Sequence, residues 1–277
     1  MKPSWASHPI ALISAAVVLA GCVMQSGTNR SALHGVPRED ATSMLAHQQL
    51  LQKAHTGRID LYFLGDSITR RWGATDYPQL LQQFDVSFRG WNPGNFGWGA
   101  DRIANILWRI ENGELDGVKP RVIVLMAGTN DVGNQLPPEG AEAAAERIAA
   151  DLGDLLHAVR LRAPQATVIL MGLLPRFDNP AVMPVIDGIN RRIARNADGR
   201  RVRFLNINQQ LLDANGRLLP GMLNADQLHP ALPAYQVWTA ALEPLLLRLL
   251  GPRAAIDRAP PATGVPTAPP ASGAVAR

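Results

Sequence analysis

A serine that could act as a nucleophile follows the first apolar run of the folded part of the chain. The run IDLYFLG ends at Gly65, and Asp66 and Ser67 come directly after it. A serine hydroxyl attacks a carbonyl carbon only when a base, usually a histidine oriented by an acid, accepts its proton. Without such partners, Ser67 would simply be the N-cap of a helix that begins there. The histidines decide between these two interpretations.

The chain has six histidines, and five lie where a base for Ser67 is not expected. They fall in the N-terminal leader and the residues after it, in an opening helix, or inside a later helix: His8, His34, His47, His55 and His157. The sixth, His229, follows Asp226 by three positions in NADQLHP. A carboxylate at this spacing can hold the imidazole Nδ1–H and leave Nε2 free as a base. Alone, the pair would be a loop with an aspartate cap; together with Ser67 it predicts a Ser-His-Asp triad.

Acyl transfer also needs hydrogen-bond donors for the charge that develops on the carbonyl oxygen. Asn130, in the stretch AGTND, follows a later apolar run and offers a side-chain NH2. The backbone N–H groups of Ser67 and of the loop 97–100 are further candidates, although Asn130 would also fit a turn. The sequence has no HExxH, no histidine pair at metal-ligand spacing, no phosphate-binding glycine loop and no complete GxSxG elbow. It therefore predicts neither a metal nor a cofactor.

Short apolar runs predict the strands that would position these loops. The expected strands are 60–64, 86–88, 122–126, 167–171 and 202–205. Apolar spacings of three and four predict helices over 102–111, 139–161, 182–196 and 234–250. Continuous apolar strands that alternate with helices are typical of a parallel sheet covered on both faces. The pattern predicts an α/β fold, in which ligands bind beyond the carboxyl ends of the strands.

Composition and charge are ordinary for a globular protein. The chain has 277 residues, of which 47% are hydrophobic and 18% are charged, enough to form a sizeable core. The net charge of +4 is too small to indicate nucleic-acid binding. The single cysteine, Cys22, excludes disulfides within the chain and any metal site built from cysteines.

The first 22 residues resemble a bacterial lipoprotein signal. One lysine precedes an uncharged apolar run, 10–20, that is too short to span a bilayer. The run ends in Leu-Ala-Gly-Cys, and in such signals the chain is cut before the cysteine, which carries a diacylglycerol. An ordinary signal peptide with a chance cysteine is the alternative. We expect lipidation of Cys22 and attachment to a membrane surface of the bacterial cell envelope, on the periplasmic or outer-membrane side.

Two stretches flank the predicted domain and lack core-forming residues. Residues 23–38 are rich in Ser, Gly, Thr and Asn and predict a flexible tether. Residues 253–277 are rich in Pro and Ala and predict a disordered tail. The expected folded domain is therefore 39–252, without internal repeats.

Four short blocks resemble, in order and spacing, those of the SGNH (GDSL) hydrolases. They are GDS at 65–67, NFGWGAD at 95–101, GTND at 128–131 and DQLH at 226–229. The stretch NFGWGADRIANILWRIENGEL, with KPRVIVLMAGTND and GLLPR after it, is most similar to the branch of the platelet-activating-factor acetylhydrolase catalytic subunits and their bacterial relatives. The resemblance implies a three-layer α/β/α flavodoxin-like fold with a five-stranded parallel sheet. It also implies a metal-free serine esterase.

The resemblance assigns a role to each matching residue. Ser67 would be the nucleophile and His229 the base, oriented by Asp226. The backbone N–H groups of Ser67 and Ala100, with the side chain of Asn130, would form the oxyanion hole. Asp101 and Asp131 would be structural partners at helix starts or in loops.

The second block departs from the family pattern at one position. The glycine expected immediately before the aspartate is replaced by Ala100, and Gly99 stands before it. Alanine has the same backbone N–H. If the loop needs a positive φ at this position, alanine strains it by about 1 kcal/mol or more.

The substrate class depends on the aromatic residues near the loops and on the resemblance. Aromatic residues in or beside the loops, Trp72, Trp91, Phe96 and Trp98, would suit a sugar face or an acyl chain, or would simply pack. The resemblance to secreted bacterial esterases implies short acyl esters, chiefly acetyl, carried on a glycan. A lysophospholipase or other lipid acylhydrolase is the alternative. Acyl transfer to a sugar hydroxyl, and an inactive module that binds a glycan or an envelope partner, also stay open.

Overall fold

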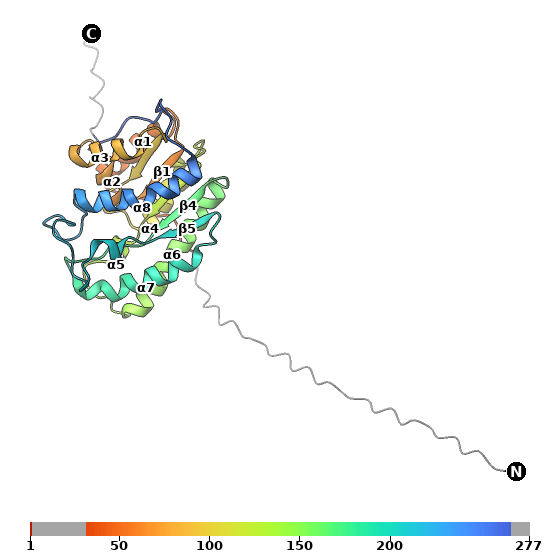
Figure 1. The fold of residues 1–277 in the computed structure, drawn as a ribbon, viewed down its shortest axis with the longest axis vertical. Coiled ribbons are helices and arrows are strands. Elements are labelled where there is room, and N and C mark those ends of the chain that lie inside the picture. The colour runs from red at the N-terminus through yellow and green to blue at the C-terminus, as the bar shows by residue number, and fades with distance from the viewer. Residues whose placement is uncertain (2–31, 267–277) are drawn as a thin grey trace, which may run out of the picture. The chain divides into compact units, whose positions relative to one another are not determined.

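The computed structural model describes Met1 and residues 32–266 (Figure 1). Residues 2–31 and 267–277 lie outside the described residues, and with them the predicted signal apart from Met1, the lipidation site Cys22 and the first part of the predicted tether. Lipid attachment at Cys22 therefore stays a prediction, which mass spectrometry of the mature N-terminus would test. Within the described part of the chain, every helix is too short or too polar to cross a membrane.

Five parallel strands form one sheet at the centre of the domain. In spatial order they are β2 (Pro93–Gly97), β1 (Leu61–Gly65), β3 (Val122–Met126), β4 (Thr167–Met171) and β5 (Val202–Leu205). The two central strands, LYFLG and VIVLM, are buried along their whole length, as their unbroken apolar sequences predict. The chain reverses its direction across the sheet at β1 and β3, so their carboxyl ends open onto the crevice in which ligands of such sheets bind.

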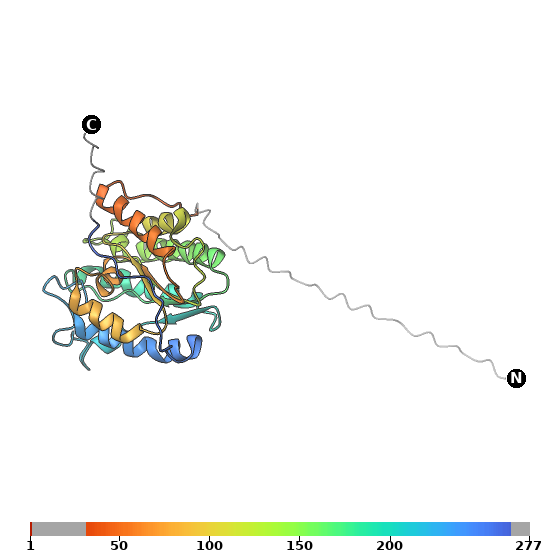
Figure 2. The same cartoon turned by 90° about the horizontal axis from the view of Figure 1, so that it is seen from above.

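Helices cover both faces of the sheet, which confirms the predicted three-layer arrangement (Figure 2). One face carries α1 (Ala41–Ala54), α4 (Ile103–Arg109), α5 (Thr129–Val132), α6 (Ala141–Arg162) and α7 (Met183–Ile193). The other face carries α2 (Ser67–Trp72), α3 (Pro78–Phe88) and α8 (Leu232–Leu250). Single turns complete the chain: the π-turn η1 (Ile110–Glu114) and the 3-10 turns η2 (Pro180–Val182), η3 (Ala194–Asn196) and η4 (Asn208–Leu211).

The strands divide their side chains between the two cores. In β1, Tyr62 and Leu64 pack under the first helical layer, whereas Leu61 and Phe63 pack under the second. Phe63 contacts the ring of Trp72 from α2, with centroids 5.7 Å apart. Because side chains of β1 point alternately to the two faces of the sheet, Phe63 faces α2 and packs against it.

The predicted strand 86–88 is wrong. These residues are the last turn of α3, in which buried Leu80, Phe84 and Phe88 recur at helical spacing while Val86 is exposed. The strand in this position is β2, whose sequence PGNFG contains residues that strands usually disfavour. It is an edge strand and begins with its proline, the position where a strand tolerates one.

The predicted tether and tail are also wrong where the structure describes them. Residues 32–38 lie against the domain: the Leu33 N–H donates to the Asp154 carboxylate at 2.8 Å, and the Val36 N–H to the Ala104 carbonyl at 3.0 Å. Residues 253–266 are likewise held by backbone hydrogen bonds. Hydrophobic patterning could not reveal either segment, because backbone hydrogen bonds hold them and only isolated apolar side chains such as Leu33 pack against the core.

The tail runs past the edge strand. The Arg258 N–H donates to the Asn92 side chain at 2.7 Å, and the Thr75 N–H donates to the Thr263 carbonyl at 3.1 Å. Together with Asn95 and Pro93 of β2, Pro260 and Pro261 line a cavity of about 280 Å³. The outward groups of β2 have local partners, since Lys53 Nζ donates to the Asn95 carbonyl at 2.9 Å.

Deleting residues 253–277 should lower the free energy of unfolding by about 2 kcal/mol, because several buried or half-buried backbone groups lose their partners. A fall of several degrees in Tm, measured by circular dichroism, would report this loss. Deleting only 267–277 is the matched control and should leave Tm unchanged. Equal Tm values for both truncated chains would contradict a stabilising role for residues 253–266.

Candidate active site

Ser67 lies at the carboxyl end of β1, on the first residue of α2. Its neighbour Asp66, not Ser67, is the N-cap: the Ile68 N–H donates to the Asp66 carboxylate at 2.9 Å. The Ser67 hydroxyl is therefore not used to open the helix. Gly65 allows this tight strand-to-helix turn, because a Cβ on it would lie 2.2 Å from Thr69 Oγ1 and 2.3 Å from the Met126 carbonyl oxygen.

The structure brings the three residues of the predicted triad together. His229 Nε2 lies 2.9 Å from Ser67 Oγ, and His229 Nδ1 lies 2.8 Å from Asp226 Oδ2. The other carboxylate oxygen of Asp226 accepts the N–H groups of Leu228 and His229, at 3.1 and 2.9 Å. Asp226 is thus both the cap of its own turn and the partner of the imidazole.

The electrostatic environment favours an ionised Asp226 and a neutral His229. Burial would raise the pKa of Asp226, but the N–H groups of His229 and Leu228 and the imidazole outweigh it and lower this pKa to about 2. Burial lowers the pKa of His229, and the nearby positive charge of Arg71 lowers it further, against the opposing hydrogen bond of Asp226. A neutral imidazole at pH 7 can accept a proton from Ser67.

The loops after β2 and β3 carry the predicted oxyanion donors. Asn130 Nδ2 donates one hydrogen bond to the Asp101 carbonyl at 2.8 Å, which fixes the amide group and leaves its second hydrogen unused by this bond. Ala100 is exposed and precedes Asp101. Among the described residues, no hydrogen bond is donated by the Ala100 N–H. The Asp131 carboxylate also accepts the Ile103 N–H at 3.1 Å. The loops after β2 and β3 are therefore joined by hydrogen bonds in both directions.

Ala100 has φ +59°, in the left-handed region that favours glycine. The departure from the family pattern therefore falls on a position that does need a positive φ. Gly99 does not need one, and a Cβ on it would have no neighbour within 4 Å. The loop keeps the backbone conformation at a cost of about 1 kcal/mol in local strain.

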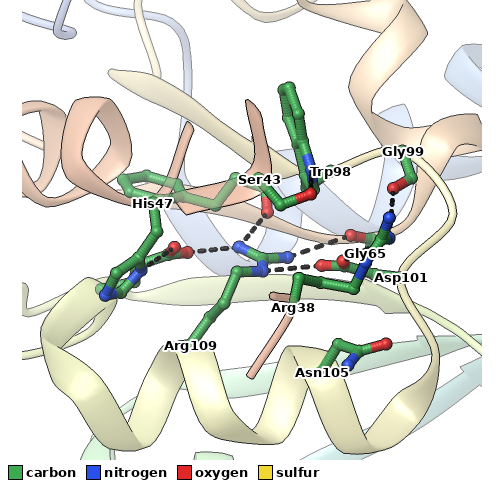
Figure 3. Close-up of polar contacts among 12 residues, drawn as sticks. Arg38, Ser43, His47, Gly65, Trp98, Gly99, Asp101, Asn105 and Arg109 are labelled. Carbon is green, nitrogen blue, oxygen red and sulfur yellow. Dashed lines mark hydrogen bonds and ion pairs between the residues drawn. The ribbon is translucent and has the colours of Figure 1, made fainter. Parts of the chain in front are cut away.

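A buried arginine supports these loops from below (Figure 3). Arg109 Nε donates to the Asp101 carboxylate at 2.7 Å, and its Nη atoms donate to the carbonyls of Phe96 and Gly65, at 3.1 and 3.3 Å, and to Glu114. Arg109 thereby ties the carboxyl ends of β1 and β2 to the residue after Ala100. Sequence reasoning missed Arg109, because an arginine within a predicted helix usually lies on the solvated face.

A second buried arginine supports the other side of the site. Arg176, the last residue of GLLPR, donates to the carbonyls of Thr129 and Gly133 at 3.2 and 3.3 Å and to the Asn134 side chain at 2.8 Å. It holds the loop that contains Asn130. Its place beyond the carboxyl end of a predicted strand is the signal that could have found it.

Three of the four aromatic residues expected near the site belong to the core. Trp72, Trp91 and Phe96 are buried, so the packing interpretation is right for them. Trp98 is half-buried and donates its Nε1–H to Ser43 Oγ at 2.8 Å.

The three histidines of the expected helices have other environments. His55 and His157 are exposed, and His47 pairs with buried Glu114 at 2.8 Å.

A cavity of about 560 Å³ is connected to the triad through Arg71. Arg71, one helical turn after Ser67, borders it and lies 3.5 Å from Asp226. The cavity is lined by polar and apolar groups, among them Tyr77, Gln79, Asn224, Leu80 and Leu232. The guanidinium of Arg71 lies over the ring of Tyr77, 5.3 Å from its centroid. Sequence reasoning missed Arg71 and Tyr77, although the i, i+4 relation of Arg71 to Ser67 places it on the same helix face.

Comparisons with known proteins agree with the four blocks. The sequence model of the GDSL-like Lipase/Acylhydrolase family matches residues 63–237. The chain is 30% identical over 237 residues to the platelet-activating factor acetylhydrolase IB subunit alpha1 of Bos taurus, covering 81% of this chain and 93% of that protein. It is 34% identical over 140 residues to the alpha2 subunit of Gallus gallus, covering 50% and 53%.

Solved structures share the fold. A putative acylhydrolase from Bacteroides fragilis superposes with a TM-score of 0.58 at 20% identity, covering 77% of this chain and all of that one. A putative platelet activating factor protein from Streptococcus pneumonia gives 0.56 at 22% identity, covering 73% and 91%. At these identities, the likeness concerns the fold alone.

Replacing Arg71 with Gln should raise the pKa of His229, because the positive charge that disfavours the imidazolium is removed. The imidazole resonances of His229, followed by NMR through a pH titration, should therefore change at higher pH in the variant than in the wild type. Arg58→Gln is the control, since Arg58 pairs with Asp60 at the amino end of β1. An unchanged or lowered midpoint in Arg71→Gln would contradict the prediction.

Proposed function

We propose that this chain, which belongs to the GDSL-like lipase/acylhydrolase family and is thus a carboxylic ester hydrolase, acts on short-chain acyl esters through an acyl-enzyme at Ser67. The family resemblance expected from the four blocks is confirmed by the match over residues 63–237. The observation that carries the proposal is the continuous hydrogen-bonded chain from Ser67 through His229 to Asp226.

In the first half-reaction, His229 Nε2 takes the proton of Ser67 as its oxygen attacks the ester carbonyl carbon. Asp226 holds Nδ1–H and stabilises the imidazolium that forms. The tetrahedral intermediate then collapses, and the imidazolium donates its proton to the departing alcohol. In the second half-reaction, the same imidazole removes a proton from water, which attacks the acyl carbon. The imidazolium then returns this proton to Ser67 Oγ as the bond to the acyl group breaks, which releases the carboxylic acid and restores the enzyme.

We assign the oxyanion hole to three donors on three different loops. They are the backbone N–H of Ser67, the backbone N–H of Ala100 and the Nδ2–H of Asn130 that Asp101 leaves unused. Because each loop follows a neighbouring parallel strand, the donors meet at one edge of the sheet. Donors fixed in this way stabilise the developing negative charge without reorganising.

We further propose that the acyl group is acetyl and that its carrier is a carbohydrate. The acetyl group is supported by the name of the 30% identical relative, an acetylhydrolase. The carrier is supported by the cavity that Arg71 borders next to Asp226, where Tyr77 offers an aromatic ring and Arg71, Gln79 and Asn224 offer polar groups suited to a polyol. Leu80 and Leu232 on the same cavity favour the second candidate, a lipid acylhydrolase.

Replacing Ser67 with Ala should lower kcat for p-nitrophenyl acetate by about 10³-fold or more, because the nucleophile is lost. Circular dichroism should show the same fold in both proteins. His229→Ala should lose activity comparably, whereas His157→Ala, a matched histidine exposed on α6, should not. Equal rates for wild type and Ser67→Ala would contradict the mechanism and leave the inactive glycan-binding module as the better interpretation.

The acyl preference should be for acetyl over long chains. The measurement is kcat/KM for p-nitrophenyl esters from acetyl to palmitoyl, and a maximum at long chains would contradict the acetylesterase proposal in favour of the lipid candidate. For the carrier, Tyr77→Ala should raise KM for an acetylated oligosaccharide more than for p-nitrophenyl acetate. Equal changes in KM for the two substrates would argue against a sugar in the cavity.

A further inference from the structure

Arg38 reaches the proposed oxyanion loop from outside the family region (Figure 3). It lies just before α1, in the segment whose sequence predicts a tether. Its Nη1 donates to the Gly99 carbonyl at 3.2 Å and lies 3.7 Å from Asp101 Oδ1. Its Nη2 lies 2.9 Å from the Asp40 carboxylate. Asp40 is also the N-cap of α1, and so the guanidinium is held from a fixed helix end.

The carbonyl that Arg38 binds belongs to the same peptide unit as the Ala100 N–H. A peptide unit is planar and trans, so its C=O and N–H point in opposite directions. Fixing the Gly99 oxygen therefore fixes the direction of the Ala100 N–H. Arg38 contacts one end of this peptide, and the other end is a donor of the proposed oxyanion hole.

The peptide needs such support because Ala100 is strained. With φ +59°, Ala100 would be relieved by a change to negative φ, which would rotate the Gly99–Ala100 peptide. That rotation would take the Gly99 carbonyl away from Arg38 and the Ala100 N–H away from the site. A glycine at position 100 would carry little of this strain.

Asp101 connects Arg38 to Asn130, the side-chain donor of the proposed oxyanion hole. Its Oδ2 is held by Arg109 and its carbonyl accepts Asn130 Nδ2. Its Oδ1 is buried and has no hydrogen-bond partner among the described residues, and Arg38 Nη1 lies 3.7 Å from it. The positive charge of Arg38 thus steadies the residue between the two donors.

We propose that Arg38 is a positioning residue that holds the Gly99–Ala100 peptide in its strained orientation, so that the Ala100 N–H faces the oxyanion. The proposal rests on the proposed function, since it gives the Ala100 N–H a role in turnover. It also makes the segment before α1 part of the functional unit rather than a tether.

The test is a double-mutant cycle on kcat and KM for p-nitrophenyl acetate. Arg38→Gln should lower kcat about tenfold and leave KM within about twofold, because the affected donor acts in the transition state. In the Ala100→Gly background, the same substitution should lower kcat less than about threefold, because the unstrained peptide needs less support. Arg38→Lys, which keeps one donor and the charge, should give an intermediate kcat.

Control variants separate this role from general effects. Arg58→Gln removes another arginine paired to an aspartate, at the amino end of β1, and should leave kcat unchanged. Tm is measured for every variant, and rates are taken well below it. If Arg38→Gln does not fold, Arg38→Lys alone carries the comparison in the two backgrounds.

Three results would overturn the proposal: a kcat for Arg38→Gln within twofold of wild type, a change confined to KM, or equal losses in the two backgrounds. Asn130→Ala and Ser67→Ala are assayed in parallel. If they too leave kcat unchanged, the proposed function itself has failed. If they abolish or strongly lower kcat while Arg38→Gln does not, only the role of Arg38 has failed.

Discussion

The buried guanidinium of Arg109 is the interaction on which the site most depends. It lies between two carboxylates, Asp101 and Glu114, and also binds the carbonyls of Gly65 and Phe96 at the carboxyl ends of β1 and β2. Removing one partner of such a buried group would leave uncompensated charge in the core, which typically costs several kcal/mol. The charges therefore require one another, and together they hold two strand ends and the second-block loop in a single arrangement. Arg109 thus positions the strand end before Ser67 and the loop that contains Ala100, while Arg176 holds the loop that contains Asn130.

Two aspartates near Ser67 have opposite pKa shifts, because burial dominates at one and hydrogen-bond donors dominate at the other. Asp66 is buried beside Asp101 and Asp131, and this burial raises its pKa to about 7. Asp226 is more exposed and accepts two N–H groups and an imidazole, which hold its pKa near 2. One carboxylate thus serves as a structural cap and the other as a permanent anion beside His229. The two carboxylates therefore have different roles because one is buried and the other accepts several donors near solvent.

The sequence could predict the central strands and the triad candidates, but not their supports. Ser67, Asn130 and His229 follow apolar runs or pair with an acid at short spacing, and both signals are local. The strand β2 has no such signal, because Pro93, Gly94 and Gly97 form a strand only through pairing with β1. Arg38, Arg109 and Arg176 each bind at least one backbone carbonyl from another element, beside their carboxylate partners. Every residue has a backbone carbonyl, so the amino-acid sequence does not indicate which carbonyl an arginine binds. The fold is needed to identify such contacts.

The course of the C-terminal segment also bears on how the protein behaves at high concentration. The strand β2 is an edge of the sheet, and an open edge can pair with a strand of another molecule and begin aggregation. Lys53 caps one of its outward carbonyls, and residues 258–264, with two consecutive prolines, occupy the space alongside. Proline has no N–H to offer a β-ladder, so this covering segment cannot itself recruit a further strand at those positions. A stretch with the composition of a linker therefore protects the sheet from self-association.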